Sequence, residues 1–100
     1  MHSKLLTLAL TFLICSALSA RAQVMIDFSK ITCEQYVFSK VVPPTTVAVW
    51  LSGYYNGLRK NTKLDLNQFQ KNADAVIAEC KNDPKKTVMQ IVNAMLSRKK

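Results

Sequence analysis

The sequence predicts a small all-α protein, a four-helix domain in which one disulfide joins the first and third helices. Two observations lead to this prediction. Apolar residues recur at three- and four-residue intervals along several segments, and no segment shows the strict alternation of a half-buried strand. In addition, Cys33 and Cys80 fall within the first and third of the expected helices, where a bridge would tie two helices together.

The first 22 residues are typical of a cleaved signal peptide. Lys4 gives the segment a positively charged N-terminal region. An apolar run occupies residues 5–18, and a small-residue A-x-A cleavage site ends at Ala22. The run is too short to span a bilayer with ease, although an uncleaved anchor is the alternative. Cleavage after Ala22 leaves residues 23–100 as a single secreted domain.

Cleavage would change both the cysteine count and the charge. It removes Cys15, so Cys33 and Cys80 remain as an even pair in a secreted chain, which predicts that they form a disulfide. It also removes the only histidine, His2, and two of the 14 basic residues. Twelve basic residues then face six acidic ones, which gives the mature chain a net charge of about +6.

The mature chain is expected to start with an arm and a short helix. Residues 23–31 show little periodicity and are expected to be extended or frayed. Thr32 and Gln35 then form a capping box, in which each residue can bond the backbone N–H of the other, and this predicts a helix over residues 33–39. Two successive prolines at 43–44 fix the backbone and predict a rigid turn.

The second helix is expected to begin near Thr45 or Thr46 and to be capped by Asn61. Its apolar stripe consists of Val47, Trp50, Leu51, Tyr54 and Leu58. Gly53 and Gly57 interrupt this helix, and each costs about 1 kcal/mol of helix propensity. Close approach of a neighbouring helix is the expected compensation.

Caps also predict where the last two helices begin. Asp65 and Gln68 are expected to form a second box that starts the third helix. Asp83 is expected to cap the fourth helix, with Pro84 at its first position. The apolar faces of these two helices consist of Leu66, Phe69, Ala73, Val76, Ile77 and Cys80 in the third, and Val88, Ile91, Val92, Met95 and Leu96 in the fourth. Cys80 therefore points inward, as a structural disulfide requires.

The residue inventory argues against an enzyme. Without histidine, most nucleophile–base pairs and zinc sites lose their usual partner, and two cysteines cannot complete a four-ligand zinc site. Cys33 and Cys80 are too far apart to form a C-x-x-C redox motif, and no glycine-rich phosphate loop is present. We therefore expect no catalytic residues, no cofactor and no metal site.

Four short segments occur in a characteristic order along the mature chain. They are Thr32-Cys33-Glu34, Pro43-Pro44, Val49-Trp50-Leu51-Ser52-Gly53-Tyr54-Tyr55-Asn56-Gly57 and Cys80-Lys81-Asn82-Asp83-Pro84. In this order and spacing they resemble the HdeA/HdeB family of small periplasmic acid-stress chaperones. The resemblance implies a four-helix fold with the Cys33–Cys80 disulfide and a periplasmic location. It further implies a homodimer near neutral pH that loosens in acid, exposes apolar surface and holds unfolding client proteins without ATP.

An apolar patch and a set of carboxylates are the candidate site residues. The patch is Val41, Val42, Val47, Trp50, Leu51 and Tyr54, and it is either intrachain core or a surface for a dimer partner and clients. The candidate pH-sensing carboxylates are Glu34, Asp65 and Asp83. In acid the six carboxylates lose their charge, so caps and ion pairs weaken while the net charge rises from about +6 toward +12.

The charge also supports an alternative function. A mature net charge of about +6 is strongly basic for this family, and it would favour anionic lipid head groups, acidic polysaccharides or acidic proteins. The alternative is therefore a basic envelope-binding or structural protein without chaperone activity. The secretory leader argues against a nucleic-acid partner, although the charge alone would allow weak, salt-sensitive binding.

Overall fold

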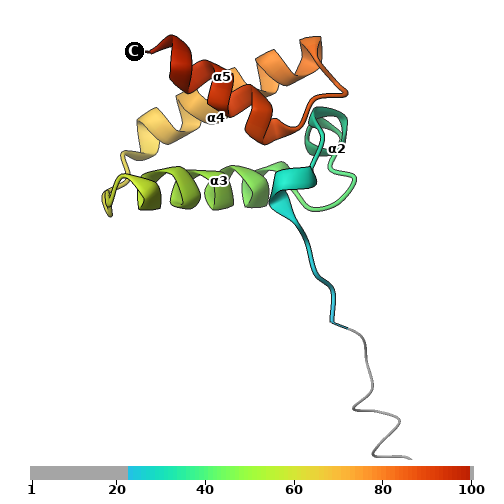
Figure 1. Ribbon diagram of the computed structural model, residues 1–100, viewed down its shortest axis with the longest axis horizontal. Helices are drawn as coiled ribbons and strands as arrows, with labels where there is room; N and C mark the ends of the chain where they lie inside the picture. The colour runs from blue at the N-terminus through green and yellow to red at the C-terminus, as the bar shows by residue number, and fades with distance from the viewer. Residues whose placement is uncertain (1–22, 100) are drawn as a thin grey trace, which may run out of the picture.

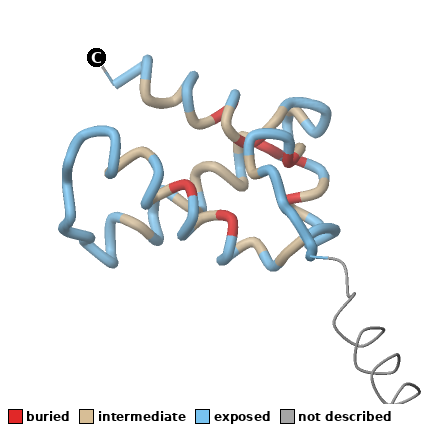
Figure 2. The backbone as a smooth tube through the Cα atoms, turned by 60° about the horizontal axis from the view of Figure 1, so that its bottom comes forward, coloured by how far each residue is buried: buried red, intermediate tan, exposed pale blue. Residues whose placement is uncertain are grey.

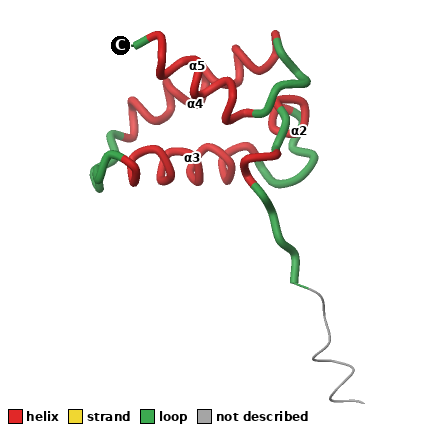
Figure 3. The backbone as a smooth tube through the Cα atoms, in the orientation of Figure 1, coloured by secondary structure: helices red, strands yellow, loops and turns green. Residues whose placement is uncertain are grey.

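The computed structural model describes residues 23–99, so the signal peptide expected over residues 1–22 lies outside the described range. The described part contains a 3-10 helix and four α-helices and no strand (Figures 1 and 3). They are η1 (Phe28–Lys30), α2 (Cys33–Val37), α3 (Pro44–Leu58), α4 (Leu66–Asn82) and α5 (Val88–Arg98). The prediction of an all-α, four-helix fold is confirmed.

The helix α2 lies at one end of the domain, where it packs against both α3 and α4. In Figure 1, α3 runs along one side of the domain, α4 and α5 lie opposite it, and α2 sits at the end where α4 finishes and α5 begins. The closest backbone packing joins α2 to α4, α4 to α5 and α2 to α3. Residues 59–65 connect α3 to α4 at the far end, where α3 approaches α4 and α5 much less closely.

The hydrophobic core is small and draws on every α-helix. Its fully covered members are Ile31, Cys33, Tyr36, Val47, Leu51, Cys80, Val88 and Ile91. Figure 2 shows the buried positions gathered inside the domain, whereas residues 38–41 and 59–65 in the connecting segments are exposed. Burial of each large apolar side chain contributes about 1.5–3 kcal/mol, so this cluster is the main source of hydrophobic stabilisation.

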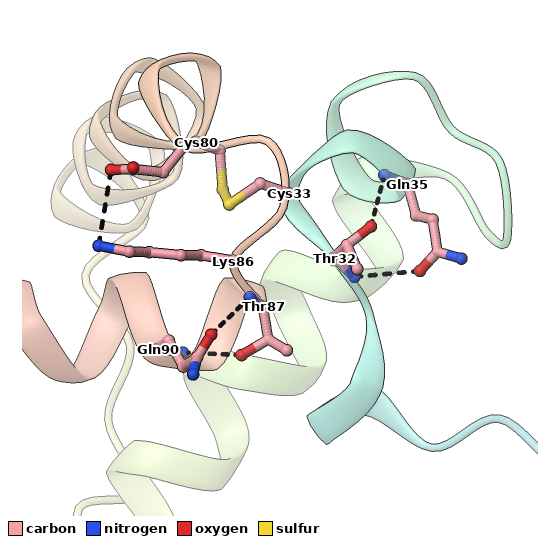
Figure 4. The surroundings of a disulfide bond; sticks show 8 residues. Thr32, Cys33, Gln35, Cys80, Lys86, Thr87 and Gln90 are labelled. Carbon is pink, nitrogen blue, oxygen red and sulfur yellow. Dashed lines mark hydrogen bonds and ion pairs between the residues drawn. A yellow bond between two sulfur atoms is a disulfide. The ribbon is translucent and has the colours of Figure 1, made fainter.

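The disulfide between Cys33 and Cys80 is present and joins α2 to α4, the first and third α-helices, as predicted. The two Cα atoms lie 4.9 Å apart and both cysteines are buried. Beside the bridge, the N-termini of α2 and α5 meet through an isolated antiparallel pairing of Thr32 with Thr87 (Figure 4). We call this region, made of Thr32, Cys33, Cys80 and Thr87, the disulfide junction.

Backbone hydrogen bonds hold the junction together. The N–H of Cys33 donates to the Lys86 carbonyl at 2.8 Å, and the N–H of Val88 donates to the Ile31 carbonyl at 2.9 Å. The predicted capping box of Thr32 and Gln35 is confirmed at the start of α2. Each bond satisfies a donor that a helix start otherwise leaves unpaired.

The prediction of a frayed arm is wrong for its last residues. Asp27 caps η1 by accepting from the Ser29 N–H at 3.0 Å, and Ile31 is only 3% exposed in the core. The arm lacks helical periodicity because it contributes single anchoring residues rather than an amphipathic face. Val24 and Met25, by contrast, belong to no helix and are almost fully exposed.

The first two α-helices differ from their predicted bounds at the ends. α2 stops at Val37, two residues early, and Ser39 takes a left-handed conformation with φ of 55°. α3 already begins at Pro44, because proline at a first helical position loses no hydrogen bond. Arg59 rather than Asn61 is its C-cap, and Lys60 turns the chain with φ of 56°.

The expected starts of α4 and α5 are corrected in part. Asp65 does cap α4, but the Gln68 side chain bonds Asn72 rather than closing a box. Asp83 ends α4 instead of starting α5. The cap of α5 is Thr87, in a second capping box with Gln90 (Figure 4).

The two glycines of α3 do not bring a helix of the same chain close. A Cβ atom added at Gly53 or Gly57 would meet no atom within 4 Å. Within the described residues the expected close approach of a neighbouring helix is therefore absent, and both glycines lie on an open side of the helix.

Candidate functional site

The structure divides the predicted apolar patch into a buried and an exposed part. Val47 and Leu51 are 1% and 6% exposed and belong to the core. The other four members lie nearer the surface: Val41, Trp50 and Tyr54 are 44%, 39% and 41% exposed, and Val42 is half-buried against the core. In the folded protomer only the exposed part is available to another protein.

The exposed part continues along the outer side of α3. Helical spacing places Val49, Trp50, Gly53, Tyr54 and Gly57 on one side of this helix, which we call the α3 outer face. All five residues are exposed, and the two glycines leave the backbone itself uncovered between the larger side chains. The sequence analysis assigned the glycines to packing and did not include Val49.

The α3 outer face carries an aromatic stack that begins on another element. The ring of Phe28 from η1 lies parallel to the Trp50 ring, with centroids 4.6 Å apart. Trp50 in turn stacks on Tyr54 at 5.3 Å, and Tyr54 meets Tyr55 edge-on at 5.1 Å. Aromatic pairs of this kind contribute about 0.5–1.5 kcal/mol beyond burial, so the stack holds the arm on α3 and stiffens the surface.

No residue of α3 carries a charge. This is unusual for an exposed 15-residue helix in a chain with 20% charged residues. Solvated helix faces ordinarily carry charged and polar residues, whereas the centres of protein–protein interfaces are depleted in charge and enriched in aromatics. The run without charge from residue 44 to 58 is visible in the sequence and is the signal that could have identified this face.

Glu34 is the predicted carboxylate with the strongest local partner. Lys40 Nζ donates to its Oε1 at 2.7 Å, with both side chains about half exposed. This hydrogen bond, together with the positive charge of Lys40, holds the pKa of Glu34 below its ordinary value of 4.5. The carboxylate therefore favours the folded state above that pH and loses this contribution as acid protonates it.

The other two predicted carboxylates occupy separate places. Asp65 caps α4 by accepting from the Gln68 N–H at 3.1 Å, at the end of the domain away from the disulfide. Asp83 lies 3.8 Å from the Lys86 ammonium, near the junction. Glu34 and Asp83 therefore both lie beside the junction, where the Glu34 N–H donates to the Pro84 carbonyl at 3.0 Å, but they pair with different lysines, whereas Asp65 lies at the start of α4.

Asp27 is a further carboxylate that the sequence analysis missed. Its Oδ1 accepts from the Ser29 hydroxyl at 2.6 Å and from the Ser29 N–H at 3.0 Å. These bonds hold the pKa of Asp27 below its ordinary value of 3.8. The Asp-x-Ser pattern of Asp27-Phe28-Ser29 was the available local signal, because Asp commonly caps short turns in this way.

Two further observations limit the chemistry of the described residues. Within residues 23–99, no three histidine, cysteine or acidic side chains come together as a metal site would require. None of the helices in this range combines the length and hydropathy needed to cross a bilayer.

Comparison with known proteins gives one match. The sequence model of the HdeA/HdeB family matches residues 3–90 of the chain. The matched range includes both cysteines, all of α2, α3 and α4, and the first turn of α5. No curated protein and no solved structure matches the chain.

Proposed function

The chain belongs to the HdeA/HdeB family, and from this premise we propose that it is an ATP-independent chaperone that prevents aggregation of acid-denatured proteins in the periplasm. The family is a periplasmic chaperone family rather than an enzyme family. The observation that carries the proposal is the uncharged, aromatic α3 outer face, because it offers unfolded chains an apolar surface on a covalently stapled domain.

Near neutral pH, the α3 outer face is covered by the same face of a second copy. Trp50 and Tyr54 supply large rigid contact surfaces, and Gly53 and Gly57 let a partner helix approach the backbone. A two-fold contact needs only one self-complementary patch, which suits a face without charge. The homodimer is thus the storage form of the chaperone.

Acid opens this dimer through charge. As the six carboxylates are protonated, the net charge of the mature chain rises from about +6 toward +12, and the two copies repel each other. The depressed pKa values of Glu34 and Asp27 mean that their stabilising bonds persist below pH 4.5 and 3.8 and then fail in stronger acid. Protonation therefore exposes the α3 outer face in the conditions that unfold clients.

The same change loosens α3 within the protomer. α3 is anchored mainly by Val47 and Leu51, whereas α2 and α4 share a disulfide that acid does not break. Partial separation of α3 would add these two side chains to the client-binding surface, so both halves of the predicted patch take part. The high positive charge keeps the complex with the client soluble.

The test measures light scattering of an acid-labile client between about pH 2 and 5 with the oxidised protein present. We expect suppression of aggregation by the wild type and its loss in Trp50→Ser/Tyr54→Ser. Leu66→Ser is the matched control, since Leu66 is 71% exposed on α4, away from the α3 outer face. Absence of protection by the wild type at every pH in this range would refute the proposal.

The strongly basic composition favours binding to anionic envelope components as the second candidate function. Such binding would be present at pH 7 and would weaken as salt screens the charges. Client binding through apolar surface would instead appear on acidification and tolerate salt. Co-sedimentation with anionic vesicles at low and high salt, at pH 7 and pH 3, separates these two behaviours.

A further inference from the structure

A cleft of about 320 Å³ lies between α3, α4 and α5. It is separate from the α3 outer face, because its wall on α3 consists of residues from the opposite side, among them Ala48, Leu51 and Tyr55. The space exists because α3 packs on α2 but approaches α4 and α5 less closely. The Tyr55 hydroxyl donates to Asn93 Oδ1 at 2.7 Å and so ties α3 to α5 beside the cleft.

The interior of the cleft is mainly apolar. Six larger apolar side chains from all three helices line its interior, namely Leu51, Phe69, Val76, Val92, Met95 and Leu96. All six are buried or half-buried, so the cleft is an extension of the core that the protein does not fill. A volume of this size is at the lower end of the range for small-molecule sites, which suits a single small apolar group.

Three of the eight exposed residues that line the cleft are basic, and only one is acidic. Arg59, Lys63 and Lys99 line it and are exposed, which places them at its rim. Figure 1 shows the 59–65 loop and the C-terminal end of α5 at the same end of the domain. The one acidic lining residue, Asp65, is engaged as the cap of α4.

The three rim cations have no carboxylate partner within residues 23–99. The four ion pairs in this range involve other basic residues, namely Lys30, Lys40, Lys86 and Arg98. Arg59 donates through Nη2 to the neutral Asn56 Oδ1 at 2.8 Å. Arg59 is exposed, and its remaining guanidinium donors form no hydrogen bond within residues 23–99, so they are suited to a carboxylate.

We propose that this cleft binds a medium-chain fatty acid, with the hydrocarbon chain among the apolar side chains and the carboxylate at the basic rim. Charge complementarity selects an anion, and the apolar interior selects one with a hydrocarbon tail. The modest volume favours one free acyl chain over a two-chain lipid. This site lies apart from the α3 outer face, so it does not depend on the proposed chaperone activity.

The first test is calorimetric titration of the oxidised protein with decanoate at neutral pH, below the concentration at which decanoate forms micelles. We expect saturable binding of one decanoate per protomer. The uncharged decanol should bind at least about tenfold more weakly, a difference of about 1.4 kcal/mol. Equal affinity for decanol, or uptake of decanoate without saturation, would overturn the proposal.

Rim and interior variants locate the site. Arg59→Gln/Lys63→Gln/Lys99→Gln should weaken decanoate binding by at least about tenfold. The matched triple variant, with Lys71, Lys81 and Lys85 changed to Gln, loses the same charge away from the cleft and should bind decanoate like the wild type. Equal weakening in both triple variants would mean non-specific attraction and would overturn the proposal.

A cavity-filling variant is independent of the rim charges. Ala73 lines the cleft from α4, whereas Ala78 is exposed on the same helix and does not line it. Ala73→Phe should abolish decanoate binding with helical circular dichroism retained, and Ala78→Phe should bind normally. Decanoate should also shift the Met95 methyl NMR signal and leave that of Met25 unchanged. Movement of Trp50 signals instead would assign binding to the α3 outer face and overturn the proposal.

Discussion

The disulfide junction and α3 hold the same small domain together by different means. At the junction a covalent bond and backbone hydrogen bonds connect α2, α4 and α5, and the buried residues are packed around Cys33 and Cys80. α3 is instead held by side-chain contacts, chiefly the packing of Val47 and Leu51 and the hydrogen bond from Tyr55 to Asn93, and it exposes its other side. α3 therefore lacks the covalent attachment that links α2 to α4, and the proposed function assigns to α3 the contact with other proteins.

Of the changes that test this comparison, removal of the disulfide should lower the stability of the fold the most. Cys33→Ser/Cys80→Ser releases a cross-link with a sequence separation of 47, for which chain entropy gives about 4 kcal/mol of stability. Urea unfolding at neutral pH, with reduced wild type alongside, measures this loss. A loss below about 1 kcal/mol would show that the hydrogen bonds and packing of the junction suffice without the disulfide.

A cavity under α3 should have the next largest effect. Leu51→Ala removes a core side chain and should lower the free energy of unfolding by about 2–5 kcal/mol. The control Leu66→Ala alters an exposed leucine and should change it by less than about 0.5 kcal/mol. If both variants were equally stable, α3 would not depend on its buried side, and the contrast with the junction would fail.

Loss of the Glu34–Lys40 ion pair should lower the stability the least. Its pH dependence shows whether acid weakens the end of the domain that holds the disulfide junction. Because the folded pKa of Glu34 is depressed, its contribution is present above pH 4.5 and disappears as pH falls through the lower folded value. Glu34→Gln should therefore lower the urea midpoint slightly at pH 6 and leave it unchanged near pH 2. An Asp74→Asn control removes one exposed carboxylate of α4 that forms none of the ion pairs within residues 23–99, so a matching pH profile there would indicate a net-charge effect.

Local sequence signals predicted those features of the fold that depend on neighbouring residues. The Thr32–Gln35 box involves residues three positions apart and was correct in both bonds. The predicted start of α5 was wrong because Asp83 and Thr87 are both plausible caps. In the structure Thr87 is the cap, and the N–H of the next residue, Val88, donates to the carbonyl of Ile31, which is distant in the sequence.

The candidate site was predictable only as a set of residues. Helical periodicity grouped Val47, Trp50 and Leu51 into one stripe, yet Trp50 is exposed and the other two are buried. An apolar stripe predicts only roughly which side of a helix is buried. How much of that side is covered depends on which elements pack against it. Phe28 could not be included, because its stacking on Trp50 joins residues of different elements.

The sequence by itself determined the all-α class, the approximate positions of the four α-helices and the cysteine pair, because helix periodicity, caps and cysteine number are local or countable properties. Only the tertiary structure decided which side of α3 is covered, where the basic cleft opens and how the arm is anchored. These features arise from contacts between residues far apart in the chain. No local pattern specifies such contacts, since the same amphipathic helix can pack at several angles and depths.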